Sequence, residues 1–258
     1  MRLTRIVKSV LLGLVAYAFI SVGEVDAKTK KKVPCRKDLS HCPDQGCGSD
    51  FDPNLNRLKN IRPNDPRAAG AAEKRTLGAM KNLDNPNEFE KGDDRDALTA
   101  LGEGKKISVV AFLIGIKPEG GESCNCGLTK TEWTDNHLVL VTRTTLNRFP
   151  LAPDEDEDDI FHSRELESIT AEFTPRVRET HPNFTREKVK PLIDDAAQKA
   201  LLVRLTGMLM FDSEHFIRNP LKRANNWEIH PILKFEYCPN RNCTAQSDAG
   251  WKSLDDIQ

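Results

Sequence analysis

The order of apolar runs between residues 107 and 237 constrains the fold more than any single motif in this chain. Ile107–Ile116 is a long apolar run, and the next two runs alternate apolar with polar residues, His137–Thr144 and Ser168–Thr174. Apolar residues in Arg186–Lys199 recur with helical spacing, and two more strand-like runs follow, Ala200–Phe211 and Trp227–Tyr237. A period of two is typical of strands, and the spacing i, i+3, i+4, i+7 is typical of helices. The pattern therefore predicts the order β-β-β-α-β-β.

The faces of these segments indicate how they pack. Ile107–Ile116 is apolar at both sets of alternating positions, which predicts a strand buried on both faces, with a bend or bulge at Gly115. Thr185 is the expected N-cap of the helix, whose apolar stripe would plug one end of a barrel. The last two strands each present one apolar face, and we expect these two faces to share a single core.

This order of elements is that of the OB-fold, a small Greek-key barrel that is used mostly for binding. We therefore expect a mainly β domain with one helix at residues 106–238, and an α+β sandwich with the same element order is the alternative. In an OB-fold the ligand lies on the second and third strands, between two loops. In this chain those loops are Lys117–Asn136 and Ser213–Asn226. The sequence thus predicts a non-enzymatic binding module of unknown ligand.

The first 27 residues have the features of a signal peptide. Arg2, Arg5 and Lys8 precede the apolar segment Val10–Val22, and Ala27 ends a cleavage-type sequence. The apolar segment is shorter than the about 20 residues needed to cross a bilayer. We expect cleavage after residue 27 and a periplasmic or extracellular protein whose mature chain has no integral membrane span. An uncleaved membrane anchor is the alternative.

Composition separates the flanking regions from the predicted barrel. Residues 28–105 are punctuated by proline and are expected to form a flexible N-terminal arm, and residues 239–258 form a C-terminal tail. The whole chain has 38 basic and 39 acidic side chains, of which residues 1–27 hold three and two. The mature chain then has a formal charge of −2. This near-neutral balance provides no global attraction to nucleic acid or to an anionic membrane.

Seven cysteines in an exported chain indicate disulfides before metal sites. Cys238 and Cys243 enclose four residues after the last strand, and we expect them to form a disulfide bond. One bridge is expected among Cys35, Cys42 and Cys47, although the spacing does not identify the pair. An odd number of cysteines leaves at least one thiol unpaired.

The first loop offers three candidate metal ligands, namely Cys124, Cys126 and, directly after the loop, His137. Two cysteines one residue apart would form a strained ring if they paired with each other. Each must therefore bridge elsewhere, stay free or bind a metal. Thiolate and imidazole ligands suit zinc or copper. Disulfide formation, a free thiol and a divalent metal site all remain open on this pattern.

The second loop combines basic residues with an aromatic residue. Such a combination suits single-stranded nucleic acid or another anionic polymer. The sequence predicts a groove for an anionic oligomer, either an oligonucleotide or a glycan, lined by Trp133, Phe216, Arg218, Lys222 and Arg223. A solvated hairpin loop is the alternative structure, and another envelope protein is the alternative partner.

A third set of candidate residues flanks the second loop: Asp212, Glu214, His215, Glu228 and His230. Carboxylates with histidines can bind a divalent metal or transfer protons, which would make the protein a metal-dependent hydrolase, for example of phosphodiesters. An outward polar face with ordinary cross-strand pairing is the alternative, and so is a purely structural envelope protein. The chain contains no nucleophile elbow, zinc-protease helix motif or phosphate-binding glycine loop.

The stretch Leu202–Phe235 resembles the ending of poorly characterised exported bacterial proteins, in which WEIHP precedes the closing strand. The likeness extends back to ESCNCG and DNHLVLV, and it implies no established activity. The topology is also similar to that of thermonuclease-like barrels, which place acids and arginines after the third strand for calcium and phosphate. In this chain Phe173 stands at the position of the acid, and Arg176 and Arg178 are the candidate phosphate contacts. This second resemblance implies a related barrel without thermonuclease chemistry.

Overall fold

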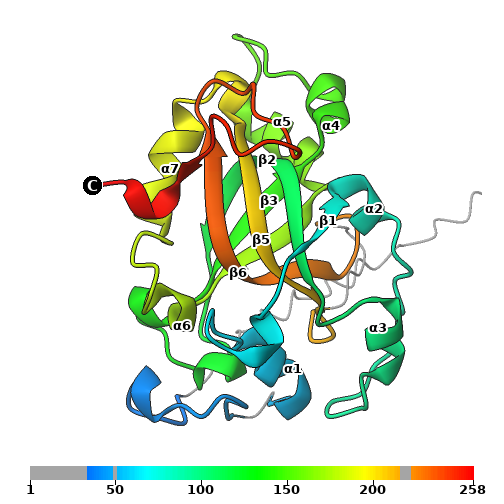
Figure 1. Cartoon of the computed structure of the whole chain (residues 1–258), viewed down its shortest axis with the longest axis vertical. Helices are drawn as coiled ribbons and strands as arrows, with labels where there is room; N and C mark the ends of the chain where they lie inside the picture. The colour runs from blue at the N-terminus through cyan, green and yellow to red at the C-terminus, as the bar shows by residue number, and fades with distance from the viewer. Residues whose placement is uncertain (1–33, 49–50, 216–221) are drawn as a thin grey trace, which may run out of the picture. The chain divides into compact units, whose positions relative to one another are not determined.

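The computed structural model describes residues 34–48, 51–215 and 222–258, so the predicted signal peptide lies outside the described residues. Within them a sheet of seven strands forms, and five of these close into a barrel (Figure 1). Two short strands extend the sheet, β1 (Glu73–Thr76) beside β2 and β7 (Lys252–Ser253) beside β6. The barrel strands are β2 (Lys106–Pro118), β3 (Asn136–Val141), β4 (Ile169–Phe173), β5 (Leu201–Phe211) and β6 (Trp227–Cys238).

Neighbouring barrel strands pair in the order β2-β3-β4-β6-β5, and β5 pairs in turn with β2. All of these pairs are antiparallel except β4 with β6, which is parallel. The connection from β4 to β6 contains β5 and two helices, α6 (Pro175–Arg178) and α7 (Arg186–Asp194). The domain is therefore mainly β and is built on a closed mixed barrel.

The strand pattern read from the sequence is confirmed to within a few residues, and so are its faces. Gly115 lies at a register shift between β2 and β3, as expected for a bulge. The apolar faces of β5 and β6 share the main core, in which Phe211, Trp227 and Phe235 are fully buried. Thr185 caps α7 by accepting a hydrogen bond from the backbone N–H of Lys188.

The expectation of a single helix does not hold, because further short helices connect the strands. Helix α7 is the predicted one, whereas the longest of the further described α-helices, α5 (Glu157–Glu165), has nine residues and only two apolar ones, which form no helical stripe. Caps and packing stabilise such helices more than intrinsic propensity does. The other α-helices are α1 (Pro53–Lys59), α2 (Leu77–Lys81), α3 (Asp96–Leu101), α4 (Arg143–Arg148) and α5 (Glu157–Glu165). Six 3₁₀ turns are also described: Leu39–His41, Pro66–Ala68, Ser123–Asn125, Thr131–Trp133, Ala197–Lys199 and Leu254–Asp256.

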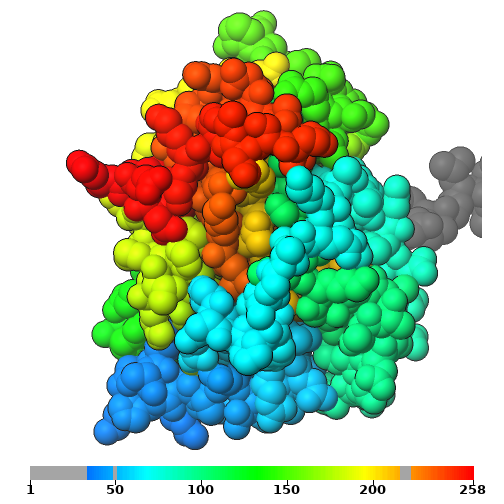
Figure 2. Space-filling model, viewed as in Figure 1, coloured from blue at the N-terminus to red at the C-terminus, as the bar shows by residue number. Residues whose placement is uncertain are grey.

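The described part of the N-terminal region packs against the barrel instead of forming the expected flexible arm. Strand β1 pairs in parallel with β2, and Leu55, Ile61, Leu77 and Met80 are fully or almost fully buried. Figure 2 shows the cyan residues of this region lying across the face of the barrel. Its few apolar side chains complete the core of the barrel rather than form a core of their own. Composition alone could not reveal this, because it measures only what a segment can bury by itself.

The C-terminal tail is also part of the fold. Strand β7 pairs with β6, and Leu254 is fully buried in the main core. The expected disulfide between Cys238 and Cys243 forms at the start of the tail. Among the described residues, no helix combines the length and the apolar character needed to cross a membrane.

Strands β5 and β6 approach each other closely at Gly207. A Cβ atom at this position would lie 2.4 Å from the backbone oxygen of Pro231 on β6. We expect Gly207→Ala to lower the free energy of unfolding by about 1–3 kcal/mol, because the backbone must shift to admit a methyl group. Gly78→Ala is the matched control, since the nearest atom there is 3.9 Å away and alanine favours helix α2. Urea unfolding compares the two variants, and equal midpoints would contradict the close approach.

Candidate functional site

Charged side chains gather on the outer face of the barrel wall formed by β3, β4 and β6. The alternate positions of these strands fill the main core, so the intervening positions point away from it. The strand register places His137 opposite Glu172, and it aligns the neighbouring residues of β4 and β6, which brings Glu172 beside His230. One row of three ionisable residues thus crosses three adjacent strands.

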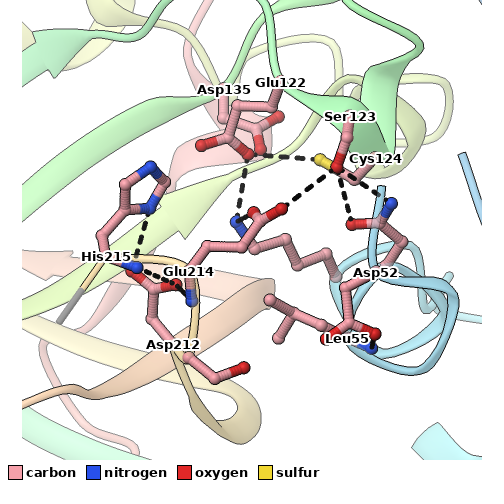
Figure 3. Close-up of polar contacts among 12 residues, drawn as sticks. Asp52, Leu55, Glu122, Ser123, Cys124, Asp135, Asp212, Glu214 and His215 are labelled. Carbon is pink, nitrogen blue, oxygen red and sulfur yellow. Dashed lines mark hydrogen bonds and ion pairs between the residues drawn. The ribbon is translucent and has the colours of Figure 1, made fainter. Parts of the chain in front are cut away.

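Three separate segments cover this row and bury it. The connection between β2 and β3 supplies Glu122, Cys124 and Asp135, helix α1 supplies Lys59, and the end of β5 leads to Asp212. Figure 3 shows Glu122, Cys124 and Asp135 close together, with Glu214 reaching from the segment after β5 towards Ser123. Glu172, Glu228 and His230 are at most 2% exposed. The alternative of an outward polar face is therefore wrong, because this strand face is interior.

Asp135, Glu172 and His230 form the centre of the cluster. One ligand atom from each lies within 4.8 Å of those of the other two. Among the described residues, Asp135 Oδ2, Glu172 Oε2 and both ring nitrogens of His230 have no hydrogen-bond partner. His230 Nδ1 lies 3.0 Å from Glu172 Oε2, which makes the two groups an ion pair when the imidazole is protonated. Buried polar atoms in native proteins are nearly always paired, so several unpaired atoms at one point make this cluster the candidate ligand site.

Outer residues hold the three central side chains in place. His137 lies between two carboxylates, with Nε2 2.7 Å from Glu172 Oε1 and Nδ1 2.9 Å from Glu119 Oε1. Asn125 donates a hydrogen bond of 2.9 Å to Asp135 Oδ1, which leaves Oδ2 directed elsewhere. Such outer partners fix the orientation of ligands in metal sites.

A second triad shares Asp135 with the first and consists of Glu122, Cys124 and Asp135. The Cys124 thiol lies 3.2 Å from Glu122 Oε2, and no disulfide involves it. Lys59 Nζ also lies 3.2 Å from Glu122 Oε2, and it is 3.5 Å from Glu214 Oε2. A buried ammonium group therefore already serves as the cation beside Glu122.

Burial and neighbouring charges shift the pKa values of residues in the site. Burial raises the pKa of the Asp135 carboxyl to about 7. Burial acts to lower the pKa of His230, but the adjacent Glu172 carboxylate outweighs it and raises the pKa to about 10. Burial, together with Glu122, raises the pKa of the Cys124 thiol well above its ordinary value. Cys124 is therefore a neutral thiol at neutral pH rather than a nucleophile.

The buried charges do not balance without an additional cation or protons. Five carboxyl groups at most 7% exposed belong to the cluster, whereas Lys59 and Arg223 are its only buried permanent cations among the described residues. The deficit of three charges can be supplied by protons on histidines or by a bound cation. The five carboxyl groups are those of Glu122, Asp135, Glu172, Asp212 and Glu228.

The predicted cysteine and histidine ligand set is only partly brought together. Cys126 forms a disulfide with Cys42, which removes it as a metal ligand. Cys124 is free and buried within the cluster, and His137 contacts Glu172 rather than either cysteine. Cys35 pairs with Cys47, so the expected single bridge among the first three cysteines forms.

The predicted oligomer groove finds no support in the residues that can be placed. Phe216 and Arg218 lie outside the described residues. Arg223 is buried and pairs with Asp212 and Glu228, whereas Lys222 is exposed. Trp133 packs against the cysteine-rich cluster that contains Cys42 and Leu128, under the Lys130 ammonium group.

The resemblance to thermonuclease-like barrels suggested Arg176 and Arg178 as phosphate contacts, and the structure does not support this role. Arg176 donates hydrogen bonds to the backbone oxygens of Cys42 and Pro43, and Arg178 donates to those of Thr131 and Thr134. Phe173 is fully buried in the main core. These arginines therefore tie loops together instead of facing a phosphate.

All five residues of the third predicted set, those that flank the second loop, belong to the cluster or its rim. Asp135 and Glu172 also belong to the site, but the sequence analysis did not include them. Two acid-x-histidine pairs were the available signal, Asp135 with His137 and Glu228 with His230. Residues two apart share one face of a strand, so each pair places a carboxylate and an imidazole together. Glu172, an acid inside the apolar strand β4, was the third clue.

The chain matches no protein-family model, and comparison with curated proteins and with solved structures gave no match either.

Proposed function

We propose that the protein is an exported binding module with an OB-like barrel and that its ligand is a divalent transition-metal ion. The ion would be held by Asp135, Glu172 and His230 on the outer face of the barrel wall. The observation that carries the proposal is the convergence of buried ligand atoms on these three residues, which make no hydrogen bond to the described residues.

The strand arrangement supports the OB-like part of the proposal. An OB-fold is a five-stranded Greek-key barrel that binds its ligand on the second and third strands, between two loops. Strands β3 and β4 are the second and third of the barrel here, and they carry His137 and Glu172. The two rim loops supply Asp135 from one side and Asp212 from the other. The cluster thus occupies the face where this fold places a ligand.

The disulfides support an exported location. Three are formed by the described residues, Cys35–Cys47, Cys42–Cys126 and Cys238–Cys243. Disulfides persist in oxidising compartments such as the periplasm and the extracellular space. The signal-type sequence at residues 1–27 points to the same location.

The geometry and donor types fit a transition-metal ion. Zinc binds nitrogen and oxygen ligands at about 2.0–2.2 Å, so ligand atoms must lie within about 4.4 Å of each other. The three ligand atoms are within 4.8 Å, and a small inward movement of the side chains closes this gap. Two carboxylates with one imidazole suit zinc, manganese or iron better than calcium, which prefers only oxygen ligands.

The metal titration is the direct test. We expect the purified protein, after treatment with a chelator, to bind one equivalent of Zn²⁺ or Mn²⁺ in isothermal titration calorimetry. Binding to the native state should also raise its stability, by about 2.7 kcal/mol when the free ion is 100-fold above its dissociation constant. A protein that binds neither of these ions would contradict the proposal.

Variants locate the ion within the cluster. His230→Gln and Glu172→Gln should each weaken binding by more than about 100-fold, which exceeds the usual effect of losing an outer partner. His162→Gln is the matched control, because His162 lies exposed on α5, where its Nδ1 is 2.6 Å from the backbone oxygen of Asp158 and its ring meets that of Phe161 edge-on. Circular dichroism shows whether each variant is folded. Unchanged affinity in a folded His230→Gln variant would place the ion elsewhere.

A further inference from the structure

A pocket of about 250 Å³ lies between helices α5 and α7 and strand β2. Figure 1 shows α5 and α7 at the end of the barrel opposite α1, the helix that supplies Lys59 to the buried cluster. The volume is below the about 300–1,000 Å³ of sites for drug-sized ligands, so the pocket suits a smaller molecule. Much of its wall is apolar and is formed by Ile114, Ile116, Leu151, Ile160, Phe161 and Ile193.

Arg164 belongs to the wall of this pocket and is a buried cation without a carboxylate partner. The residue is 2% exposed, and its Nε and Nη1 atoms donate hydrogen bonds to the backbone oxygens of Phe149 and Gln198. Its Nη2 atom is buried and makes no hydrogen bond within the described part of the chain. A guanidinium group stays protonated in proteins. The two carbonyl oxygens therefore hold the group in place but leave its positive charge uncompensated.

The other buried arginines in the described ranges each have a carboxylate partner. An oxygen of that carboxylate lies within 3.6 Å of each guanidinium group, and the pairs are Arg95 with Glu103, Arg176 with Asp44, Arg204 with Glu236 and Arg223 with Asp212. The hydrogen bond with Glu236 raises the pKa of Arg204, whereas burial alone lowers that of Arg164. Buried charges in proteins are paired as a rule. Arg164 is thus the group on this wall whose charge an anionic ligand would neutralise.

A second cation without an ion-pair partner lies near Arg164. Lys199 lines the pocket directly after Gln198, whose backbone oxygen Arg164 binds. The ammonium group of Lys199 donates a hydrogen bond to the backbone oxygen of Asp194, and it forms no ion pair with the residues that the structure describes. The other two lysines of the lining are compensated, Lys117 by Glu165 and Lys190 by Asp194. The uncompensated positive charge is therefore concentrated at one end of the pocket.

The opposite end of the pocket is acidic. Glu157 and Asp158 line it from the first turn of α5, and both are exposed. Arg164 follows Glu157 by seven residues, which corresponds to about 10 Å along a helix axis. Residues seven apart lie on the same face of a helix, so α5 presents a carboxylate and a guanidinium group at the two ends of one wall. A ligand with one negative charge fits this arrangement better than a ligand with a negative charge at each end.

We infer that this pocket binds a small monocarboxylate with an apolar body, whose carboxylate pairs with Arg164 and whose body contacts the apolar wall. Charge-assisted hydrogen bonds of this kind are about twice as strong as neutral ones. The lining side chains must move slightly to admit the carboxylate, because Nη2 is buried, and such rotamer changes are common on binding. The site shares no residue with the metal site proposed above, so the two can be tested separately.

Octanoate is the probe for the carboxylate, and octan-1-ol has the same chain length without the charge. We expect the chelator-treated protein to bind one equivalent of octanoate saturably in isothermal titration calorimetry, below the concentration at which micelles form. Octan-1-ol should bind at least about 10-fold more weakly, because it cannot form the hydrogen bond between two charged groups. Octanedioate should also bind more weakly than octanoate, because its second carboxylate meets Glu157 and Asp158.

Two variants test the site in different ways. Arg164→Gln removes the charge and should weaken octanoate binding by about 10- to 100-fold. Its matched control is Arg148→Gln, since Arg148 is 58% exposed and lies outside the lining. Leu151→Trp leaves the guanidinium group intact but fills the pocket with a larger side chain, so it should abolish octanoate binding. Its matched control is Leu166→Trp, because Leu166 is 51% exposed and also lies outside the lining.

Circular dichroism and Zn²⁺ affinity show whether each variant retains the fold. Absence of octanoate binding to the wild type, or equal affinity for octanoate and octan-1-ol, would overturn the inference. Unchanged octanoate affinity in a folded Leu151→Trp variant would overturn it as well, even if Arg164→Gln does not fold. Equal affinity for octanoate and octanedioate would contradict the orientation of the ligand between Arg164 and the acidic end. A protein that binds octanoate but not Zn²⁺ would support this site and contradict only the metal site.

Discussion

Replacing Lys59 with methionine is expected to destabilise the protein by about 3–5 kcal/mol, because it leaves a buried carboxylate without its counter-charge. The Lys59 side chain is 1% exposed, and its ammonium group lies between Glu122 and Glu214. Methionine preserves most of the packing volume, so the loss reports the missing charge rather than a cavity. Equilibrium unfolding in denaturant at neutral pH measures the effect.

The pH dependence of the variant has a defined sign. Burial opposes ionisation of Glu122, but Lys59 outweighs it and holds the pKa of Glu122 below its ordinary value of 4.5. In the wild type Glu122 therefore adds stability above pH 4.5 that is lost as the pH falls through the lowered pKa. In Lys59→Met the effect of burial remains, so protonation of Glu122 should stabilise the variant, and its stability should rise relative to wild type as the pH falls.

Two further variants make this result interpretable. Lys59→Met combined with Glu122→Gln should recover much of the lost stability, because the uncompensated charge is then absent. Lys190→Met is the matched control, since Lys190 pairs with Asp194 on the surface of α7, where both side chains are 44% exposed, and such pairs contribute about 0–1 kcal/mol. A Lys59→Met variant no less stable than Lys190→Met would show that Lys59 does not neutralise the cluster.

The sequence predicted those elements of the fold in which the spacing of apolar residues along the chain reflects which residues are buried. Strands β5 and β6 alternate clearly, because one face of each lies in the core and apolar burial selects for that pattern. The N-terminal region has no such pattern. Its buried residues, such as Ile61 and Leu77, contact a core whose other members lie far away in the chain. Long-range packing of this kind leaves little local signal.

The burial of the candidate site could not be predicted from the sequence for a related reason. Glu172 and His230 sit on strand positions that alternate with core residues, which ordinarily indicates a solvent-facing side. They are buried because α1 and the connection between β2 and β3 cover them, and only the three-dimensional structure shows that cover. The types of residue were informative even so, since an acid-x-histidine pair on a strand, or at its start, places both ligands on one face wherever that face lies.

Removing the disulfide between Cys42 and Cys126 is expected to cost about 4–5 kcal/mol of stability. The bond closes a loop with a sequence separation of 84 residues, and in the chain-entropy description a longer loop gives a larger effect on the unfolded state. We therefore expect Cys42→Ala with Cys126→Ala to shift the unfolding midpoint strongly. Equilibrium unfolding of this double variant, with the other two disulfides intact, measures the loss.

The disulfide between Cys238 and Cys243 provides the control for loop length. Its sequence separation is 5, for which the same description gives only about 2 kcal/mol. The two bonds also differ in position, because Cys126 lies in the connection that carries Glu122 and Asp135, whereas Cys243 lies in the C-terminal tail. Loss of the long-range bond should therefore weaken Zn²⁺ binding as well as stability, and loss of the short one should leave Zn²⁺ affinity unchanged.

Equal effects of the two double variants on stability would refute the loop-length argument. Equal effects on Zn²⁺ affinity would refute the argument that the Cys42–Cys126 bond holds the connection, and with it Asp135, against the barrel wall.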